Sequence, residues 1–186
     1  MSDNNVKNGD IQPLIDCDSW CRTRGGPEAK HKFVWTIERF SQRPEKNTES
    51  LDSDIFTIQG PCNMKTQWRI RLFPKCESQE VSDYVSVYLR NETEVEVKVR
   101  FELSILRSNR SKQCIVKTAI NDFTDFSAFT GWGAAKAIKL SNLQRQSSEL
   151  LPNDSLTIVC DVTIFGPGET INPNNKKQII TRNLKV

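Results

Sequence analysis

The longest strict alternation in the chain runs from Glu94 to Leu106, and it constrains the fold more than any other segment. Its odd-numbered positions are apolar: Val95, Val97, Val99, Phe101, Leu103 and Ile105. Its even-numbered positions up to Ser104 are charged or polar. A period of two predicts a β-strand. Because one side is apolar and the other polar, the pattern is typical of an antiparallel sheet with one solvated face.

Shorter runs of the same kind recur along the chain and predict seven or eight strands in all. The clearest are 33–38, 55–58, 68–72, 84–89, 113–117 and 156–165. The run 132–140 mixes good helix formers with apolar residues, so we expect one or two helical turns there as a short crossing element. The absence of βαβ alternation favours an all-β, antiparallel Greek-key sandwich of two sheets.

The 186 residues fit one domain with two tails. Residues 1–30 are rich in Asn, Asp, Gly and Pro without an apolar period, which predicts a flexible leader. The domain is expected over 31–166. Residues 167–186 again have the composition of a linker or tail.

Charge and targeting signals narrow the class of protein. The net charge is +3 with a pI near 8.5, and basic and acidic residues are interleaved, so no nucleic-acid-binding face is predicted. The N-terminus lacks an apolar signal-peptide core, and no apolar run reaches the roughly 18 residues of a membrane span. We expect an intracellular protein, nuclear or cytoplasmic, that does not bind membranes.

The cysteines and the single histidine give no sign of metal or catalytic chemistry. Without a secretory signal the six cysteines are expected to be reduced, and Cys160 alternates with apolar neighbours as a small core residue would. His31 lies between Lys30 and Lys32, with no nucleophile motif nearby. The sequence therefore predicts a protein that is not an enzyme and has no cofactor and no bound metal.

Aromatic residues gather ahead of two glycines in the second half of the chain. Phe123, Phe126, Phe129 and Trp132 fall within ten residues, and Gly131 and Gly133 flank the Trp. One interpretation is a loop fixed to the core by its rings. The other is the wall of a groove, in which the glycines let an extended peptide approach the backbone closely.

Five segments in order resemble one known family, the MATH (meprin and TRAF homology) domain. They are Phe33-Val-Trp-Thr-Ile-Glu-Arg-Phe-Ser41, Asp83-Tyr-Val-Ser-Val-Tyr-Leu89, Phe101-Glu-Leu-Ser-Ile-Leu106, Gly131-Trp-Gly133 and Leu150-Leu-Pro-Asn-Asp-Ser-Leu-Thr157. The resemblance covers about residues 31–166. The flanks, including Ser19-Trp-Cys-Arg-Thr23, look like those of speckle-type POZ proteins.

That resemblance implies a substrate-recognition module of a ubiquitin-ligase adaptor. In speckle-type POZ proteins a BTB/POZ domain after the MATH domain recruits a cullin-type ligase, and here it would be expected beyond Val186. The family binds short Ser/Thr-rich peptides of protein substrates. The resemblance leaves two alternatives open: a TRAF-like signalling adaptor, which the lack of heptads in 1–30 disfavours, and the targeting domain of a deubiquitinase or protease.

The same resemblance implies the residues of the peptide groove. Tyr88, Phe101, Trp132 and Gly133 match groove positions of the family, and Phe123 or Phe126 is expected to take the aromatic position before them. Two departures are visible. Ala134 stands where an aromatic is usual, and Thr130-Gly131 replaces a charged pair, which predicts a groove that is either reshaped or weakly binding. The alternation also puts Phe101 on the apolar face with Val97 and Val99.

Overall fold

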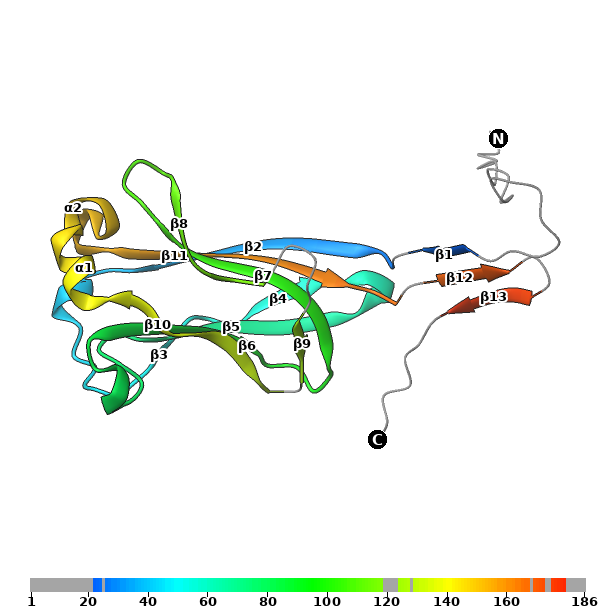
Figure 1. The fold of residues 1–186 in the computed structure, drawn as a ribbon, viewed down its shortest axis with the longest axis horizontal. Coiled ribbons are helices and arrows are strands. Elements are labelled where there is room, and N and C mark those ends of the chain that lie inside the picture. The colour runs from blue at the N-terminus through cyan, green and yellow to red at the C-terminus, as the bar shows by residue number, and fades with distance from the viewer. Residues whose placement is uncertain are drawn as a thin grey trace. The chain divides into compact units, whose positions relative to one another are not determined.

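The computed structural model describes residues 22–24, 26–118, 124–127, 129–167, 169–172 and 175–179. The chain divides into two compact units (Figure 1). The larger unit spans Glu28–Gly166 and contains all the elements discussed for function. The smaller combines the two ends of the chain.

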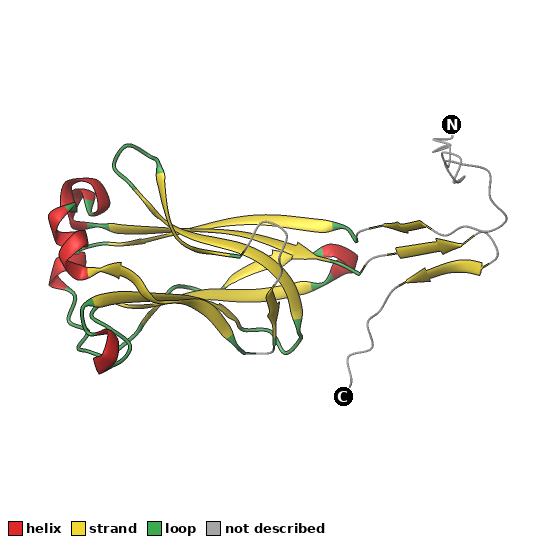
Figure 2. Ribbon diagram, viewed as in Figure 1, coloured by secondary structure: helices red, strands yellow, loops and turns green. Residues whose placement is uncertain are grey.

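The larger unit is a sandwich of two five-stranded antiparallel sheets (Figure 2). In the first, called the β6 sheet, the order is β10-β6-β5-β3, with β4 also paired to β5. Its strands are β3 (Leu51–Asp52), β4 (Phe56–Gln59), β5 (Lys65–Phe73), β6 (Tyr84–Asn91) and β10 (Gly131–Lys139). The predicted antiparallel sandwich is confirmed.

The second sheet, called the β11 sheet, has the order β2-β11-β7-β8, and β9 pairs with another part of β7. Its strands are β2 (Glu28–Ile37), β7 (Val97–Leu106), β8 (Lys112–Lys117), β9 (Thr124–Phe126) and β11 (Leu156–Phe165). Neighbouring strands in both sheets are often distant in sequence, as in the Greek-key connections expected from the pattern. The very short strands β3 and β9 raise the strand number above the expected seven or eight.

The core lies between the sheets and follows the period of two in each strand. Trp68, Ile70 and Leu72 of β5 are fully buried, and so are Leu103 of β7 and Ile164 of β11. Trp68 donates from Nε1 to Thr66 Oγ1 at 2.8 Å, so its one polar atom is satisfied. Burying each large apolar side chain contributes roughly 1.5–3 kcal/mol, and this common core fixes the register of the strands on both sides.

Strand β7 begins three residues later than its alternation suggests. The sequence predicts a strand from Glu94, whereas the strand begins at Val97 and Val95 is 46% exposed. Asn91 explains the difference, because its side chain binds both the amide of Thr93 and the carbonyl of Val95. These bonds hold the residues before Val97 in a turn.

The segment 132–140 is a strand for most of its length, so the predicted helical turn is wrong there. β10 runs through Lys139, and the helices α1 (Leu140–Arg145) and α2 (Ser147–Leu150) follow it. Helix propensity is a weak preference, and pairing with β6 overrides it. A bulge between Ala134 and Ile138 takes up the extra residues of the Ala-rich stretch. Four 3-10 turns complete the element order: Phe40–Gln42, Pro61–Asn63, Gln79–Val81 and Pro152–Asp154.

The smaller unit contains a three-stranded antiparallel sheet that the sequence did not predict. Its strands are β1 (Arg22–Arg24), β12 (Glu169–Asn172) and β13 (Asn175–Ile179), in the order β1-β12-β13. The expected leader and tail therefore contribute backbone pairing, and β2 begins at Glu28, three residues before the expected boundary. Polar strands of this kind lack the apolar alternation by which a strand is recognised in a sequence.

Candidate functional site

Strand β10 is the edge of the β6 sheet, and in the described part of the chain β6 is its only strand partner. Trp132 lies opposite Leu89 and Gly133 opposite Tyr88. Asn91 N donates to Thr130 O at 2.8 Å, so Asn91 and Thr130 form a hydrogen-bonded pair of the antiparallel ladder. Because hydrogen-bonded and non-bonded pairs alternate in antiparallel strands, the N–H and C=O groups of Gly131 and Gly133 point away from β6. They form a free backbone edge.

Gly133 approaches β6 so closely that no side chain fits. A Cβ at this position would lie 2.0 Å from Val87 O and 2.6 Å from Tyr88 Cα. At Gly131 the corresponding distances are 3.1 Å to Arg90 Cγ and 3.2 Å to Leu89 O, which is tight but less severe. The glycines of the Gly-Trp-Gly step therefore permit close pairing with β6, and they leave the outer face of the edge, on which both positions lie, without side chains.

Two large aromatic side chains are exposed beside this edge. Trp132 is 55% exposed and Phe129 is 53% exposed. By register Trp132 is on the core-facing side of the sheet, yet it lies at the margin of the sandwich where the core does not cover it. Phe129 has φ of 56°, and its carbonyl accepts a hydrogen bond from Arg90 Nη2 at 3.0 Å. Exposed rings next to a free edge could contact a bound chain.

Asn91 holds the segment before β10 through hydrogen bonds of its side chain. The sequence does not identify it as a site residue. It is fully buried, and its Nδ2 donates to Val95 O at 2.9 Å and to Ser127 O at 3.2 Å. Thr130 Oγ1 donates to the same Ser127 carbonyl at 2.8 Å. A signal was present in the sequence, because Asn91 continues the core-facing series of Val85, Val87 and Leu89 with a polar residue.

Tyr88 lies on the outer face of the β6 sheet, across from Gly133. Its ring makes an edge-to-face contact with Phe73 at a centroid distance of 6.3 Å. Burial raises the pKa of the Tyr88 phenol, and a hydrogen bond to Glu77 and the charge of that carboxylate raise it further. The phenol is therefore neutral and directed to Glu77, while the ring borders the place where Gly133 has no side chain.

The other predicted groove residues lie in different surroundings. Phe101 is 3% exposed and packs in the core opposite Val162, so in this conformation it supports the fold from within. Ala134 is half-buried opposite Val87. Phe126 pairs through its backbone with Val97, but its side chain and the whole of Phe123 lie outside the described residues.

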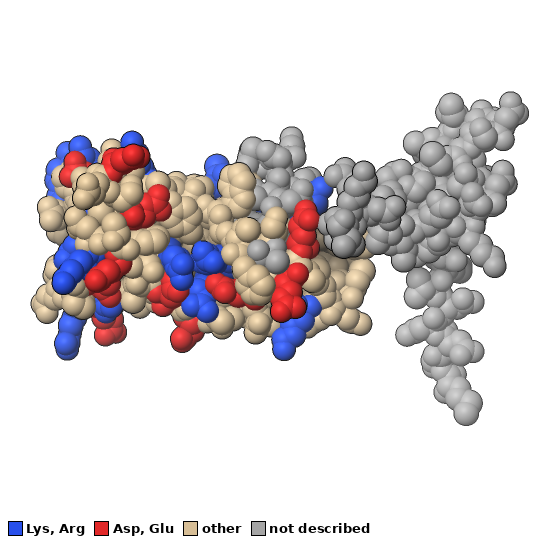
Figure 3. Space-filling model, turned by 90° about the horizontal axis from the view of Figure 1, so that it is seen from below, with Lys and Arg blue, Asp and Glu red and all other residues tan. Residues whose placement is uncertain are grey.

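A chain of ion pairs stabilises the outer face of the β6 sheet. Arg71 Nη2 lies 2.6 Å from Asp52 Oδ2, and Arg69 Nη1 lies 3.0 Å from the same oxygen. Arg69 and Arg90 both lie near Glu92 Oε1, at 3.0 and 3.4 Å. The Arg71 hydrogen bond lowers the pKa of Asp52 against the effect of burial. Figure 3 shows acidic and basic side chains intermixed on this side of the molecule.

Among the residues that the structure describes, the remaining His and Cys side chains do not gather into a chemical site. His31 stacks its ring on Phe56 at 5.6 Å and so contributes to packing. Cys62, Cys76, Cys114 and Cys160 are free thiols, and burial raises the pKa of Cys160. Within the described residues no three His, Cys, Asp or Glu side chains gather as metal ligands. None of the helices described in the structure is long and apolar enough to cross a membrane.

Comparison with known families agrees with the fold and with the segments that carried the resemblance. The MATH domain model matches residues 32–162, which is more than half of the chain. The match includes most of β2, both strands that flank the Asn91 turn, all of β10 and most of β11. MATH domains act in general as protein-interaction modules. This chain belongs to the MATH domain family.

Proposed function

We propose that this MATH domain recognises protein substrates by holding a short, extended peptide along the free edge of β10. The observation that carries the proposal is the pair of unpaired backbone positions, Gly131 and Gly133, beside the exposed ring of Trp132. An extended ligand can add a strand to such an edge. Its main chain then supplies affinity, and its alternate side chains supply specificity.

The two sides of the edge differ, so alternate ligand side chains meet different surroundings. Side chains on the core-facing side would approach Trp132, the large ring that most resembles an interface anchor. Side chains on the outer side would pass over Gly133 toward Tyr88. Ala134 replaces the aromatic usual in the family, and we propose that the space it leaves favours a bulkier apolar ligand residue, followed by Ser or Thr.

The finer proposal places the chain with speckle-type POZ proteins, as a substrate-binding part of a cullin-type ubiquitin ligase. Its support is the likeness of the flanking segments, including Ser19-Trp-Cys-Arg-Thr23, to those proteins. The ligase would be recruited by a BTB domain outside these 186 residues. Such a protein would work in the nucleus or the cytoplasm.

Fluorescence polarisation tests the peptide site directly. A labelled panel of peptides with an apolar residue followed by Ser/Thr positions is titrated with the wild-type domain, with Trp132→Ala and with Val34→Ala. Val34 is 51% exposed on β2, in the other sheet, and serves as the matched apolar control. We expect micromolar binding, roughly −8 kcal/mol, that is lost only in Trp132→Ala. Folded protein that binds no panel peptide would contradict the proposal.

A second experiment tests strand addition and leaves the protein unchanged. Amide N-methylation of the best peptide removes one donor at a time. Methylation at alternate residues, those facing Gly131 and Gly133, should abolish binding, while methylation at the residues between should be tolerated. If every position is equally tolerant, the ligand does not pair with β10.

The ligase role needs its own measurement. The full reading frame and residues 1–186 are compared for co-precipitation of a cullin from cell extract. Capture by the full reading frame alone supports the adaptor role. Failure of both removes the ligase proposal and leaves the peptide site to be judged by its own titration.

A further inference from the structure

Two connections between the sheets meet at the end of the sandwich where β10 begins (Figure 1). Residues 92–96 lead from β6 to β7, and the second connection leads from β9 to β10. Asn91 ties them together, because its Nδ2 donates to Val95 O at 2.9 Å and to Ser127 O at 3.2 Å. The two carbonyl oxygens therefore lie beside one nitrogen atom, and the connections share one continuous surface.

This surface exposes large apolar side chains that the core does not cover. Val95 is 46% exposed on the first connection, and Phe129 is 53% exposed on the second. Trp132, the second residue of β10, is 55% exposed at the proposed peptide edge. Gathered apolar side chains of this kind mark a place where a partner binds. Val95 and Phe129, together with Glu94 and Glu96, form the Val95 surface.

Two exposed carboxylates border Val95. They belong to Glu94 and Glu96, and among the described residues neither makes an ion pair or a hydrogen bond. Glu92, the first residue of the same connection, is half-buried and lies 3.0 Å from Arg69. The negative charge at Glu94 and Glu96 is thus the part that a ligand can reach.

The basic side chains closest in the chain do not neutralise these carboxylates. Arg90 lies 3.4 Å from Glu92 and donates from Nη2 to Phe129 O at 3.0 Å. Lys98 follows Glu96 by two residues, and the contact that it makes involves neither Glu94 nor Glu96. Negative charge therefore remains beside an apolar surface.

We propose that the peptide held along β10 continues past Gly131 with a basic segment that binds the Val95 surface. A Lys or Arg side chain of that segment lies over Phe129 and directs its charged group to Glu94 and Glu96. This inference rests on the function proposed for β10 and specifies its ligand class. The ligand is an apolar, Ser/Thr-containing peptide with basic residues on one flank.

The distance from the β10 edge to the Val95 surface is short. Asn91 alone spans the gap between Thr130 O and Val95 O, because its main-chain N binds the first and its Nδ2 the second. Thr130 directly precedes Gly131, and an extended chain advances about 3.3 Å per residue. A flank of two or three residues, roughly, and a long basic side chain therefore reach the carboxylates.

The chemistry of the Val95 surface favours a basic side chain over other ligands. The methylene stem of Lys or Arg can lie along apolar side chains while the charged group stays in water, and a cation over the Phe129 ring gains further attraction. Nucleic acid and anionic lipid would be repelled by Glu94 and Glu96. Exposed ion pairs each contribute little, so the flank adjusts the affinity that the β10 edge provides.

The test lengthens the panel peptide that binds the wild-type domain best, either by Gly-Lys-Lys or by the matched Gly-Gln-Gln. Two successive lysines are used because neighbouring side chains of an extended chain point to opposite faces, so one of them faces the surface in either case. The extensions are made at one end or the other, since only the end that passes Gly131 reaches the Val95 surface. Fluorescence polarisation measures each affinity at about 20 mM and about 300 mM salt.

The variant Glu94→Gln/Glu96→Gln removes the two charges with little change of shape. Its control, Glu38→Gln/Glu80→Gln, removes the same charge at exposed positions after β2 and before β6, at the opposite end of the sandwich. Thermal melts establish that both variants are folded.

We expect the Lys-Lys peptide of one end to bind the wild-type domain and the control about three- to tenfold tighter than its Gln-Gln match at low salt. In Glu94→Gln/Glu96→Gln the two peptides should bind within about twofold of each other, and higher salt should reduce the preference in the wild-type domain.

Several results would overturn the inference. They are equal binding of the Lys-Lys and Gln-Gln peptides to the wild-type domain, a preference that survives in Glu94→Gln/Glu96→Gln, and the same preference at both peptide ends. Loss of the preference in the control as well would reduce the effect to net charge and overturn it too. The Gln-Gln peptides keep the β10 contacts and report on the proposed function separately. If no peptide binds the folded domain, the peptide site itself is wrong and this inference falls with it.

Discussion

Asn91, fully buried at the end of β6, donates from Nδ2 to the carbonyl oxygen of Ser127 at 3.2 Å. The two residues are far apart in sequence, and their bond ties the sheet to the segment that enters β10. The same nitrogen holds Val95 O, and Asn91 Oδ1 accepts from Thr93 N. One amide side chain therefore determines both where β7 begins and where the proposed peptide edge starts.

Asn91→Ala should lower the free energy of unfolding by about 1–3 kcal/mol, because a buried side chain loses its hydrogen bonds to Thr93 N, Val95 O and Ser127 O. We also expect weaker binding at β10, since Ser127, in the segment that enters β10, loses its bond to the end of β6. Urea denaturation and peptide titration measure the two effects. The matched control is Asn109→Ala, whose Oδ1 binds Ser111 in an exposed turn and whose loss should cost less than about 0.5 kcal/mol. Equal effects of both substitutions would contradict this role.

Gly133→Ala should destabilise the domain far more than Gly131→Ala. The added methyl would lie 2.0 Å from Val87 O at position 133 but no closer than 3.1 Å to its neighbours at position 131. Overpacking of this kind costs typically about 1–3 kcal/mol and more where the backbone must move, so the strand at 133 must shift or separate from β6. Urea denaturation of the two variants measures the difference. Equal stability of both would mean that β10 pairs with β6 in another register.

Most strands of the two sheets in the larger unit could be predicted, because their own residues carry the alternation. In β7 and β11 the alternation is long, so the residues of the strand itself show which face is apolar and which is polar. In β10 the local composition, Gly-Ala-Ala-Lys-Ala, favours helix, and only the neighbouring strand β6 makes it extended. The local sequence does not show which strand lies beside it, so a prediction from helix propensity fails where pairing with a distant strand overrides that propensity.

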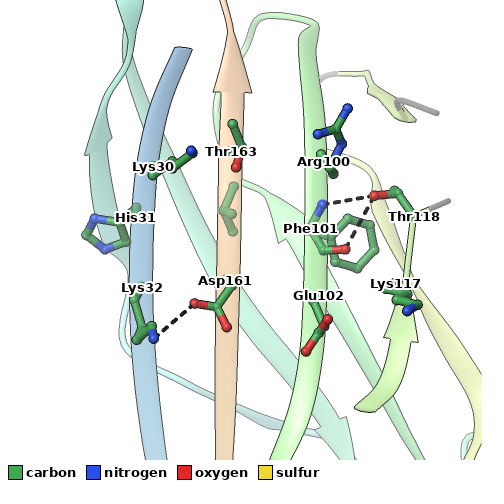
Figure 4. A pocket seen from close by; sticks show the side chains of 11 residues that line it. Lys30, His31, Lys32, Arg100, Phe101, Glu102, Lys117, Thr118, Asp161 and Thr163 are labelled. Atoms are coloured by element: carbon green, nitrogen blue, oxygen red, sulfur yellow. Dashed lines mark hydrogen bonds and ion pairs between the residues drawn. The ribbon is translucent and has the colours of Figure 1, made fainter. Parts of the chain in front are cut away.

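The candidate sites were predictable to different degrees for the same reason. The Gly-Trp-Gly step is visible as a local motif, and the structure places it on an edge strand. The group of charged side chains on the outer face of the β11 sheet is not local (Figure 4). Lys32 meets Asp161 only because β2 pairs with β11, and Lys112 reaches the same carboxylate across β7. Such a surface follows from strand order and register, which the pattern of one strand does not determine.

Trp132→Ala and Trp68→Ala should separate binding from stability. Trp132 is 55% exposed, so its truncation should change the unfolding free energy by less than about 1 kcal/mol while weakening the peptide by about 2 kcal/mol or more. Trp68 is fully buried, so Trp68→Ala should lower the free energy of unfolding by about 3–5 kcal/mol. Denaturation curves and polarisation titrations provide both numbers. A large stability loss in Trp132→Ala would place its ring in the core and not at an interface.

Acid should destabilise the domain partly through Asp52. Its hydrogen bond to Arg71 lowers the folded-state pKa below the ordinary 3.8. A carboxylate with a lowered pKa stabilises the fold fully above its unfolded pKa, and that contribution is lost as pH falls through the ordinary value and then the folded one. Asp52→Asn should therefore be less stable than wild type near neutral pH, and the difference should shrink between about pH 5 and pH 2. Urea unfolding at several pH values measures this difference in stability.

In an Arg71→Met background the substitution Asp52→Asn should change the pH dependence of stability less, because the main cause of the pKa shift is absent. An undiminished effect in that background would assign the pKa shift to Arg69 instead.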